Sequence, residues 1–178
     1  MAREIVLGVT GSIAAYKACD LVRRLRELGH GVSVVLTHEA AQFITPLSLQ
    51  VLSGRRVHAE MFERTDASAI AHTTLADDAE LVLIAPATAN VIAKLAHGLA
   101  DDVLTCTVLA TQAPVLVVPA MNVHMYRHPT TQANLAALRR LRYHLLEPVV
   151  GQLACGYEGI GHLPDVEMIV AAAQRLLG

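Results

Sequence analysis

Short runs of apolar residues alternate along this chain with longer segments in which apolar and polar residues are mixed. The most uniform run, residues 81–85, is too short to span a membrane and is followed by Pro86, which we expect to end it. Such a run predicts a parallel strand buried on both faces. Small and polar residues at 87–90 then precede a helical pattern that resumes at Val91. In open α/β sheets, ligands bind at junctions of this kind.

The same alternation predicts four further strands, at residues 3–9, 32–36, 115–118 and 143–146. Helical patterns are found at residues 13–28, 46–53, 72–79, 91–97, 101–110 and 130–140, and Asp165 is expected to cap a closing helix. Residues 57–71, 120–129 and 151–164 lack a sustained period and predict loops. Strands that alternate with helices indicate a flavodoxin-like (Rossmann-like) three-layer α/β sandwich with a central parallel sheet in the order 2-1-3-4-5.

Length and composition refine this picture. With 178 residues, of which 53% are hydrophobic and only 3% aromatic, the chain is expected to form one domain with an aliphatic core. The mean hydropathy of +0.43 indicates a doubly covered sheet and apolar surface that meets other subunits. A net charge of −2 without a basic run argues against nucleic acid as a partner.

Export and membrane insertion are not expected. Residues 1–15 fit a first strand better than a signal peptide, and Pro114 and Pro119 interrupt the uncharged segment 103–126. The three cysteines are odd in number and show no CxxC spacing, which predicts free thiols in the cytoplasm. No metal site is expected, because His124 and His128 lack a third ligand.

The turn formed by Thr10, Gly11, Ser12 and Ile13 is the first candidate binding element. Gly11 permits close backbone approach and Ser12 can donate to a phosphate at the start of a helix. The turn lacks the full GxGxxG spacing, and Thr37 stands where a dinucleotide fold often has an acid, so a mononucleotide suits it better than NAD. A plain turn with a helix cap is the alternative.

Three further residues are candidates for chemistry. Cys155 lies in a glycine-rich segment, where a thiol can act as proton donor or nucleophile, and His72 precedes the central strand as a candidate acid–base group. Asn122 follows the fourth strand, where its amide can bind a carboxylate beside two methionines that offer adaptable apolar walls. The alternatives are an incidental loop cysteine, a non-catalytic histidine and an asparagine in a turn.

Taken together, four motifs resemble those of the flavin-dependent cysteine decarboxylases: Gly-Ser-Ile-Ala-Ala from 11, Ala-Pro-Ala-Thr-Ala-Asn from 85, Pro-Ala-Met-Asn-x-x-Met from 119 and Ala-Cys-Gly from 154. The likeness is strongest to members that act on phosphopantothenoylcysteine in coenzyme A biosynthesis, and it covers essentially the whole chain. The resemblance implies bound FMN, assembly from trimers and active sites where subunits meet. It also implies that FMN oxidises the thiol carbon to a thioaldehyde that accepts electrons as CO₂ leaves.

The resemblance assigns roles residue by residue. It implies that His72 is the catalytic base, that Asn122 binds the substrate carboxylate and that Cys155 is a late proton donor. Residues expected to bind substrate are Asn122, Gln152, Leu153 and Ala154. Residues expected to hold the flavin are Gly11, Ser12, Ile13, Thr37, Thr88, Ala89, Asn90 and Ala120.

The sequence departs from the family pattern in three motifs, where Tyr126 replaces a common Trp, Thr73 and Thr74 follow His72, and His162 and Leu163 replace Arg-Met. These changes bear on flavin packing and phosphate binding. Many relatives continue into a domain that ligates cysteine to phosphopantothenate, so the chain is expected to be either a stand-alone decarboxylase or a domain of a bifunctional protein, with a possible ligase domain or partner. A peptidyl-cysteine decarboxylase, a flavin prenyltransferase and a non-catalytic regulatory flavoprotein remain alternatives.

Overall fold

The central strand β3 (Leu81–Ala87) is buried at every one of its seven positions, as its uninterrupted apolar sequence requires. It lies in a computed structural model that describes residues 2–61, 71–152, 156 and 158–178. On one side it pairs with β1 (Glu4–Val9), which pairs in turn with β2 (Gly31–Leu36). On the other side it pairs with β4 (Val115–Pro119), followed by the short β5 (His144–Leu145).

All four pairings in this five-stranded sheet are parallel, and its order is β2-β1-β3-β4-β5. This confirms the predicted flavodoxin-like arrangement. Because the chain reverses its direction of winding after β2, the carboxyl ends of β1 and β3 lie beside each other where the crossovers depart to opposite faces. A ligand site is expected above that pair of strand ends.

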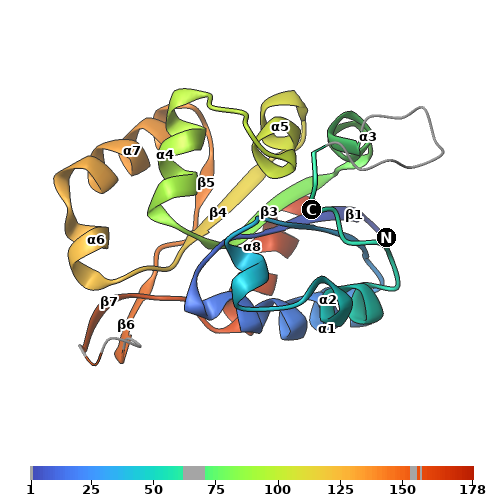
Figure 1. Ribbon diagram of the computed structural model, residues 1–178, viewed down its shortest axis with the longest axis horizontal. Helices are drawn as coiled ribbons and strands as arrows, with labels where there is room; N and C mark the ends of the chain where they lie inside the picture. The colour runs from blue at the N-terminus through green and yellow to red at the C-terminus, as the bar shows by residue number, and fades with distance from the viewer. Residues whose placement is uncertain (1, 62–70, 153–155, 157) are drawn as a thin grey trace.

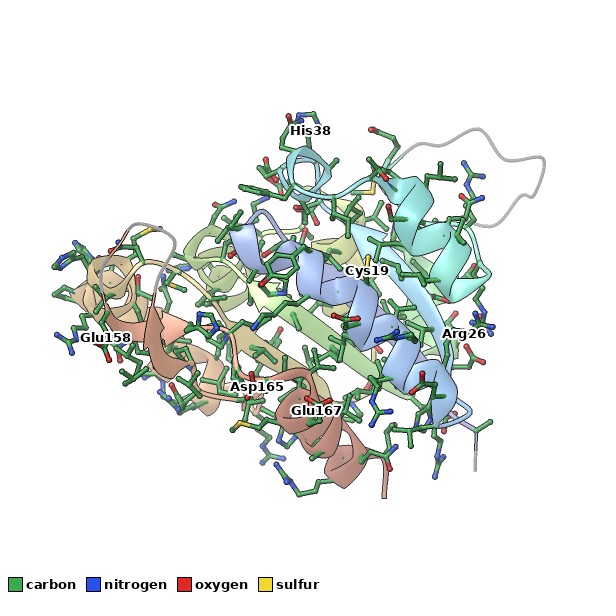
Figure 2. The ribbon with its side chains drawn as sticks, turned by 90° about the horizontal axis from the view of Figure 1, so that it is seen from below. Cys19, Arg26, His38, Glu158, Asp165 and Glu167 are labelled. Atoms are coloured by element: carbon green, nitrogen blue, oxygen red, sulfur yellow. The ribbon has the colours of Figure 1, made fainter. Side chains whose placement is uncertain are left out.

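Helices cover both faces of the sheet (Figure 1). One face carries η1 (Ile13–Lys17), α1 (Ala18–Glu27), α2 (Pro46–Ser53) and α8 (Val166–Leu177). The other carries α3 (Ala71–Asp78), α4 (Ala89–His97), α5 (Val103–Ala110) and α7 (Pro129–Arg140). Figure 2, which views the molecule from below, shows α1 and α8 lying across the first of these faces. In the described ranges, none of the helices combines the length and the apolar character needed to cross a membrane.

The helix boundaries follow from capping residues in the sequence. Thr45 and Thr88 each accept a hydrogen bond from a backbone N–H in the first turn of α2 and α4. Gly54 and Gly98 end those helices in the left-handed conformation, with φ of 67° in both cases. Asp165 occupies the N-cap position of α8, as expected, but its side chain makes no capping hydrogen bond.

Several predicted boundaries are wrong around prolines and glycines. Pro86 does not end β3, because a register shift between Ile84 and Ala87 accommodates it inside the strand. The predicted helix 13–28 begins as the 3₁₀ segment η1, and α4 begins at Ala89 rather than at Val91. Part of segment 57–71 is ordered against the sheet, since His58 bridges to Val35, while residues 62–70 lie outside the described part of the chain.

Two predicted loops contain regular structure. Segment 120–129 includes the short helix α6 (Val123–Arg127). Elsewhere, a 3₁₀ turn, η2 (Ala40–Gln42), follows β2. Segment 151–164 contributes to an antiparallel pair, β6 (Val149–Gln152) and β7 (Glu158–His162). The sequence did not predict these strands, because glycine is normally unfavourable in a strand. It is tolerated in a strand where another backbone approaches closely.

Candidate functional site

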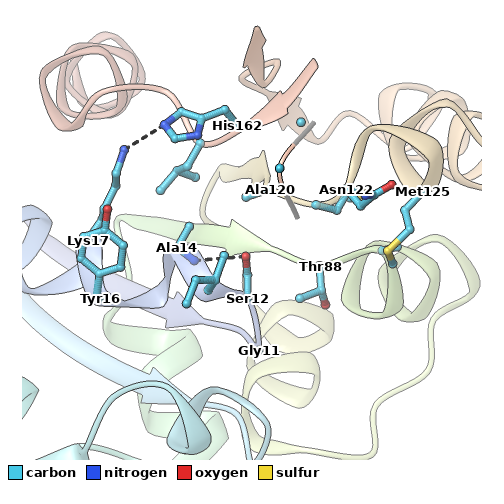
Figure 3. A pocket seen from close by; sticks show the side chains of 16 residues that line it. Gly11, Ser12, Ala14, Tyr16, Lys17, Thr88, Ala120, Asn122, Met125 and His162 are labelled. Atoms are coloured by element: carbon cyan, nitrogen blue, oxygen red, sulfur yellow. Dashed lines mark hydrogen bonds between the residues drawn. The ribbon is translucent and has the colours of Figure 1, made fainter. Parts of the chain in front are cut away.

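A cavity of about 590 Å³ lies at the carboxyl ends of β1, β3 and β4 (Figure 3). Its walls come from segments that are far apart in the sequence: η1 and the turn before it, the start of α4, the start of α6, and β7 with the residue after it. The lining residues are Gly11, Ser12, Ile13, Ala14, Tyr16, Lys17, Thr88, Ala89, Ala120, Met121, Asn122, Met125, Gly156, Gly161, His162 and Leu163. This is the position that the topology predicts for a ligand.

The Thr10 hydroxyl holds two of these strand ends together. Thr10 is fully buried, and its Oγ1 donates to the carbonyl oxygen of Pro86 at 2.7 Å and accepts from the backbone N–H of Thr88 at 3.0 Å. One β-branched side chain thereby satisfies a carbonyl and an N–H that the irregular end of β3 leaves out of the ladder. The start of α4, with Thr88 and Ala89, is fixed against the turn after β1.

Gly11 is needed for packing within the protein. A Cβ at this position would lie 2.4 Å from Cβ of Glu39, so only glycine lets the turn after β1 approach the segment before η2. Ser12 is the N-cap of η1, and its Oγ accepts from the backbone N–H of Ala14 at 3.3 Å. The helix-cap alternative is thus realised, and the hydroxyl still faces the cavity as a donor.

Asn122 also combines capping with a place in the cavity. It is the N-cap of α6, with Oδ1 accepting from the backbone N–H of His124 at 2.8 Å, and it lines the cavity with Met121 and Met125. The capping bond fixes which way the amide points, because only the amide oxygen can accept a hydrogen bond from the helix. Met121 and Met125 are the two methionines noted in the sequence beside Asn122.

The β6–β7 pair docks on this segment through two glycines. Gly161 has φ of 137°, and a Cβ there would lie 2.1 Å from the Met121 carbonyl oxygen, while a Cβ at Gly159 would lie 2.9 Å from Val123 Cγ2. The Gly161 carbonyl oxygen accepts from the Met121 N–H at 3.0 Å. In the predicted loop 151–164, these two glycines therefore allow close contact with the start of α6.

The predicted flavin residues do not all meet in the cavity. Thr37 is buried, accepts from the Ala40 N–H at 3.3 Å and lines a second cavity of about 180 Å³. Asn90 is exposed in the first turn of α4 and is absent from the main lining. The other six predicted flavin residues, Gly11, Ser12, Ile13, Thr88, Ala89 and Ala120, line the main cavity together.

Two of the predicted catalytic residues, His72 and Asn122, lie in the described part of the chain, and the main cavity does not bring them together. His72 is the second residue of α3, lines neither cavity, and its buried Nδ1 has no hydrogen-bond partner among the described residues. Gln152 ends β6, and Leu153, Ala154 and Cys155 lie outside the described residues. Of His72 and Asn122, the catalytic candidates that the structure describes, Asn122 lines the cavity. In the described part of the chain, no group of three or more His, Cys, Asp and Glu side chains is arranged to hold a metal ion.

Two lining residues were missed by the sequence reasoning. Tyr16 and Lys17 follow the recognised turn, and the signal for them was the 3₁₀ periodicity of η1, which places residues 13 and 16 on one face. Ile13 and Tyr16 are 57% and 58% exposed, which is unusual for large apolar side chains beside a cavity. Lys17 Nζ lies 3.4 Å from Nε2 of His162, as the dashed line in Figure 3 shows.

Tyr126 is in α6 and is not among the residues that line the cavity. It is 7% exposed, and its hydroxyl donates to the Glu147 carboxylate, to which Arg139 also donates. Burial, with the neighbouring Glu147 carboxylate, raises the pKa of Tyr126 to about 12. Within the chain, the Tyr126 side chain anchors α6 to the segment after β5, and its effect on flavin packing stays a prediction.

Comparisons with known proteins place the chain among flavoproteins. A family model described as Flavoprotein matches residues 1–178. The coenzyme A biosynthesis bifunctional protein CoaBC of Bacillus subtilis (strain 168) is 48% identical over 97% of this chain, which spans only 43% of that relative. A probable phosphopantothenoylcysteine decarboxylase of Streptococcus mutans serotype c is 45% identical, with 99% of this chain and 100% of that protein covered.

Solved structures give the same assignment. The FMN-dependent cysteine decarboxylase SpaF superposes with a TM-score of 0.85 at 31% identity, covering 99% of this chain and 95% of that one. A cysteine-to-serine mutant of a PPC decarboxylase, complexed with pantothenoylaminoethenethiol, superposes with a TM-score of 0.87 at 29% identity, covering 98% of both chains. The chain therefore belongs to the flavoprotein family that includes the flavin-dependent cysteine decarboxylases, as its four motifs predicted.

Proposed function

We propose that this chain is an FMN-dependent carboxy-lyase that converts phosphopantothenoylcysteine to phosphopantetheine in coenzyme A biosynthesis. The observation that carries the proposal is the convergence of separate family motifs on one cavity: Gly11–Ser12–Ile13, Thr88–Ala89 and Ala120–Met121–Asn122. The 45% identity to a probable phosphopantothenoylcysteine decarboxylase along its entire length supports this substrate over others.

The cavity fits a flavin mononucleotide. Its volume of about 590 Å³ lies in the usual range for cofactor sites, and its walls combine apolar side chains with a few polar groups and no carboxylate. Gly11, Ser12 and Ile13 would hold one end of the cofactor, and Thr88, Ala89 and Ala120 the other walls. When bound, FMN supplies reversible two-electron oxidation of the carbon that bears the substrate thiol.

The chain's own residues bind the carboxylate and move protons. The Asn122 amide nitrogen would donate to the carboxylate that leaves as CO₂, since its oxygen already caps α6. His72 would accept a proton during oxidation, and Cys155 would return one to the decarboxylated enethiolate. Gln152, Leu153 and Ala154 would cover the substrate. The PPC decarboxylase complex, in which a cysteine-to-serine mutant holds an enethiol, supports the role given to Cys155.

His72 does not line the cavity of its own chain. If it is the catalytic base, it would have to act in the cavity of a second copy of the chain. We therefore include in the proposal a homotrimer, or a multiple of one, in which His72 completes the site of a neighbouring subunit. Exposed apolar side chains support such contacts, because Phe43, Leu47 and Val51 on η2 and α2 are 47%, 67% and 70% exposed.

The same proposal implies a partner enzyme, a single domain and a cellular compartment. A phosphopantothenate–cysteine ligase, fused or separate, would supply the substrate, and the bifunctional relatives support that partner. Residues 1–178 would form one flavin-binding domain. A reducing cytoplasm suits Cys19 and Cys106, which are free, half-buried thiols whose pKa burial raises.

The test is to purify the protein, identify its cofactor and supply phosphopantothenoylcysteine. FMN should be released on denaturation, and CO₂ and phosphopantetheine should form in equal amounts without an added reductant. A parallel reaction with peptides ending in cysteine tests the peptidyl-cysteine alternative. Turnover of the peptides alone would replace the proposed substrate, and bound flavin without any turnover would favour the regulatory flavoprotein.

A further inference from the structure

Helix α6 is too short to hold its own position. It contains five residues, Val123–Arg127, and a helix of this length is unstable by itself in water, because nucleation fixes several residues for a single hydrogen bond. Its place in the molecule therefore comes from contacts with other elements. That place matters for the site, since the helix begins at Asn122 and carries Met125, and both residues line the main cavity (Figure 3).

Tyr126 makes several of these contacts. Its backbone N–H donates to the Asn122 carbonyl oxygen at 2.9 Å, and its carbonyl oxygen accepts from Nε2 of Gln132 in α7 at 2.6 Å. The side chain is buried, and its hydroxyl donates to the Glu147 carboxylate. The pKa of Tyr126, raised to about 12, keeps this hydroxyl protonated at neutral pH, so it remains a donor.

Glu147 joins three elements at one carboxylate. Oε2 accepts from the Tyr126 hydroxyl of α6, and Oε1 accepts from Nη2 of Arg139 in α7. The residue lies between β5 and β6, and the N–H of the preceding Leu146 donates to the Val117 carbonyl oxygen of β4 at 3.1 Å. The carboxylate is thus tied to the sheet, and the hydroxyl that donates to it is tied to the sheet as well.

The Glu147–Arg139 ion pair contributes little to stability by itself. The two side chains are 47% and 50% exposed, and solvent screens ion pairs of this kind. The bond from Tyr126 differs, because its donor belongs to a buried side chain on the short helix that begins at Asn122. The main effect of the Glu147 carboxylate is therefore on where α6 lies.

We propose that Glu147 is a positioning residue, which acts through Tyr126 to hold α6 and so places the Asn122 side chain for the substrate carboxylate. The proposal rests on the function proposed above, in which Asn122 binds that carboxylate. Glu147 is not among the residues that line the main cavity, so its action on the site is indirect. A displacement of about 1 Å in a positioned group can lower a rate by about 100-fold.

Hydrogen–deuterium exchange of the holoenzyme tests the anchoring without any substrate. In Glu147→Ala and in Tyr126→Phe, the amides of residues 123–127 should exchange about 10-fold faster than in the wild type, because α6 opens more readily. Glu27→Ala is the matched control, since it removes an equally exposed carboxylate paired with Arg24 on α1, outside the cavity lining. It should leave this exchange unchanged. Unchanged exchange in Glu147→Ala and Tyr126→Phe overturns the proposal.

Calorimetric titration tests the positioning itself. The holoenzyme is titrated with two unreactive analogues, the substrate with serine in place of its cysteine and the same compound without its carboxylate. The ratio of the two Kd values is the readout, and the wild type should prefer the carboxylate by about 10-fold. Glu147→Ala and Tyr126→Phe should each lose most of this preference, and the double variant should lose no more than either single variant.

Glu147→Gln separates the hydrogen bond from the charge. Its amide oxygen can still accept from the Tyr126 hydroxyl, although the negative charge is gone. It should therefore keep most of the carboxylate preference and the wild-type exchange of α6. A loss as large as that in Glu147→Ala would mean that the charge, and not the anchoring of α6, is responsible, and would overturn the proposal.

The two measurements also distinguish this proposal from the proposed function. Faster exchange of α6 with an unchanged carboxylate preference would show that the contact is structural only, and the positioning role would be wrong. If CO₂ is released in the assay above but the variants keep the wild-type preference, this proposal alone fails. If exchange and preference behave as expected but the wild type releases no CO₂, the proposed function fails and the positioning role stands.

Discussion

The Thr10 hydroxyl donates to the Pro86 carbonyl oxygen and accepts from the Thr88 N–H, which ties the end of β1 to the start of α4 beneath the cavity. We expect Thr10→Val, which keeps the shape and removes both bonds, to leave two buried backbone groups unpaired. The free energy of unfolding should fall by about 1–3 kcal/mol, and FMN affinity should fall as well. Urea unfolding and flavin titration measure the two effects.

Thr111→Val is the control for that variant. The Thr111 hydroxyl also donates to a carbonyl oxygen, that of Ala76, and accepts from a backbone N–H, that of Ala113, but it does so away from the cavity. It should cost stability without weakening FMN binding. Equal loss of flavin affinity in both variants would mean that Thr10 acts only through overall stability.

Gly161→Ala should displace the β6–β7 pair from the start of α6. The added Cβ would meet the Met121 carbonyl oxygen at 2.1 Å, and φ of 137° disfavours any residue other than glycine. Substrate KM should rise several-fold, because Met121 and Asn122 line the cavity. Gly98→Ala, which has positive φ but meets nothing within 4 Å, should lower stability and leave KM unchanged. An unchanged KM in Gly161→Ala would contradict the docking role.

Tyr126→Phe removes the hydroxyl that donates to Glu147 and should lower the free energy of unfolding by about 1–2 kcal/mol at neutral pH. The raised pKa of about 12 means that the folded protein holds the neutral phenol after the unfolded chain has ionised. The stability contributed by Tyr126 is therefore complete below pH of about 10 and is lost as the pH rises toward 12.

Chemical unfolding of both proteins from pH 8 to 12 tests this, and the advantage of the wild type over Tyr126→Phe should narrow across the upper part of that range. Tyr143→Phe is the comparison, since burial alone raises the pKa of Tyr143. It should cost less stability at neutral pH. A wild-type advantage that persists unchanged up to pH 12 would show that the Tyr126 hydroxyl is not the group responsible.

Cys155→Ser should separate CO₂ release from completion of the product. A serine hydroxyl is a far weaker acid than a thiol, whose ordinary pKa is about 8.5. If Cys155 returns the last proton, the variant should still release CO₂ but accumulate an enethiol that lacks two hydrogens relative to the normal thiol. Mass spectrometry of the product decides the matter, and normal product at full turnover would remove Cys155 from the mechanism.

His72→Asn and Asn122→Ala should each be inactive alone and should restore activity when combined in one oligomer. Random mixing of equal amounts would leave about a quarter of the shared sites with both wild-type residues, if each site draws His72 and Asn122 from different subunits. Co-expression with two affinity tags isolates the mixed oligomers, and CO₂ release measures recovery. Mixed oligomers without activity would indicate that one subunit supplies both residues.

The sequence alone determined the sheet and its ligand-binding edge. Uninterrupted apolar runs such as that of β3 can only be buried between two layers, and the alternation of such runs with amphipathic helices leads to the order β2-β1-β3-β4-β5. The turn at Gly11 and the segment ending at Asn122 were identified because each directly follows a strand. Strand ends meet at one edge whatever the details of packing.

Only the tertiary structure decided which residues share the cavity. Thr37 directly follows β2, as Thr88 directly follows β3, yet Thr37 lines the second cavity, because a strand's neighbours in the sheet depend on long-range pairing. His72 lies in α3 and lines neither cavity. The pairing of Lys17 with His162 joins residues separated by 145 positions, and no local pattern encodes it. From the local sequence, Gly159 and Gly161 predict a loop. In the structure they belong to β7, where only glycine leaves room for the start of α6.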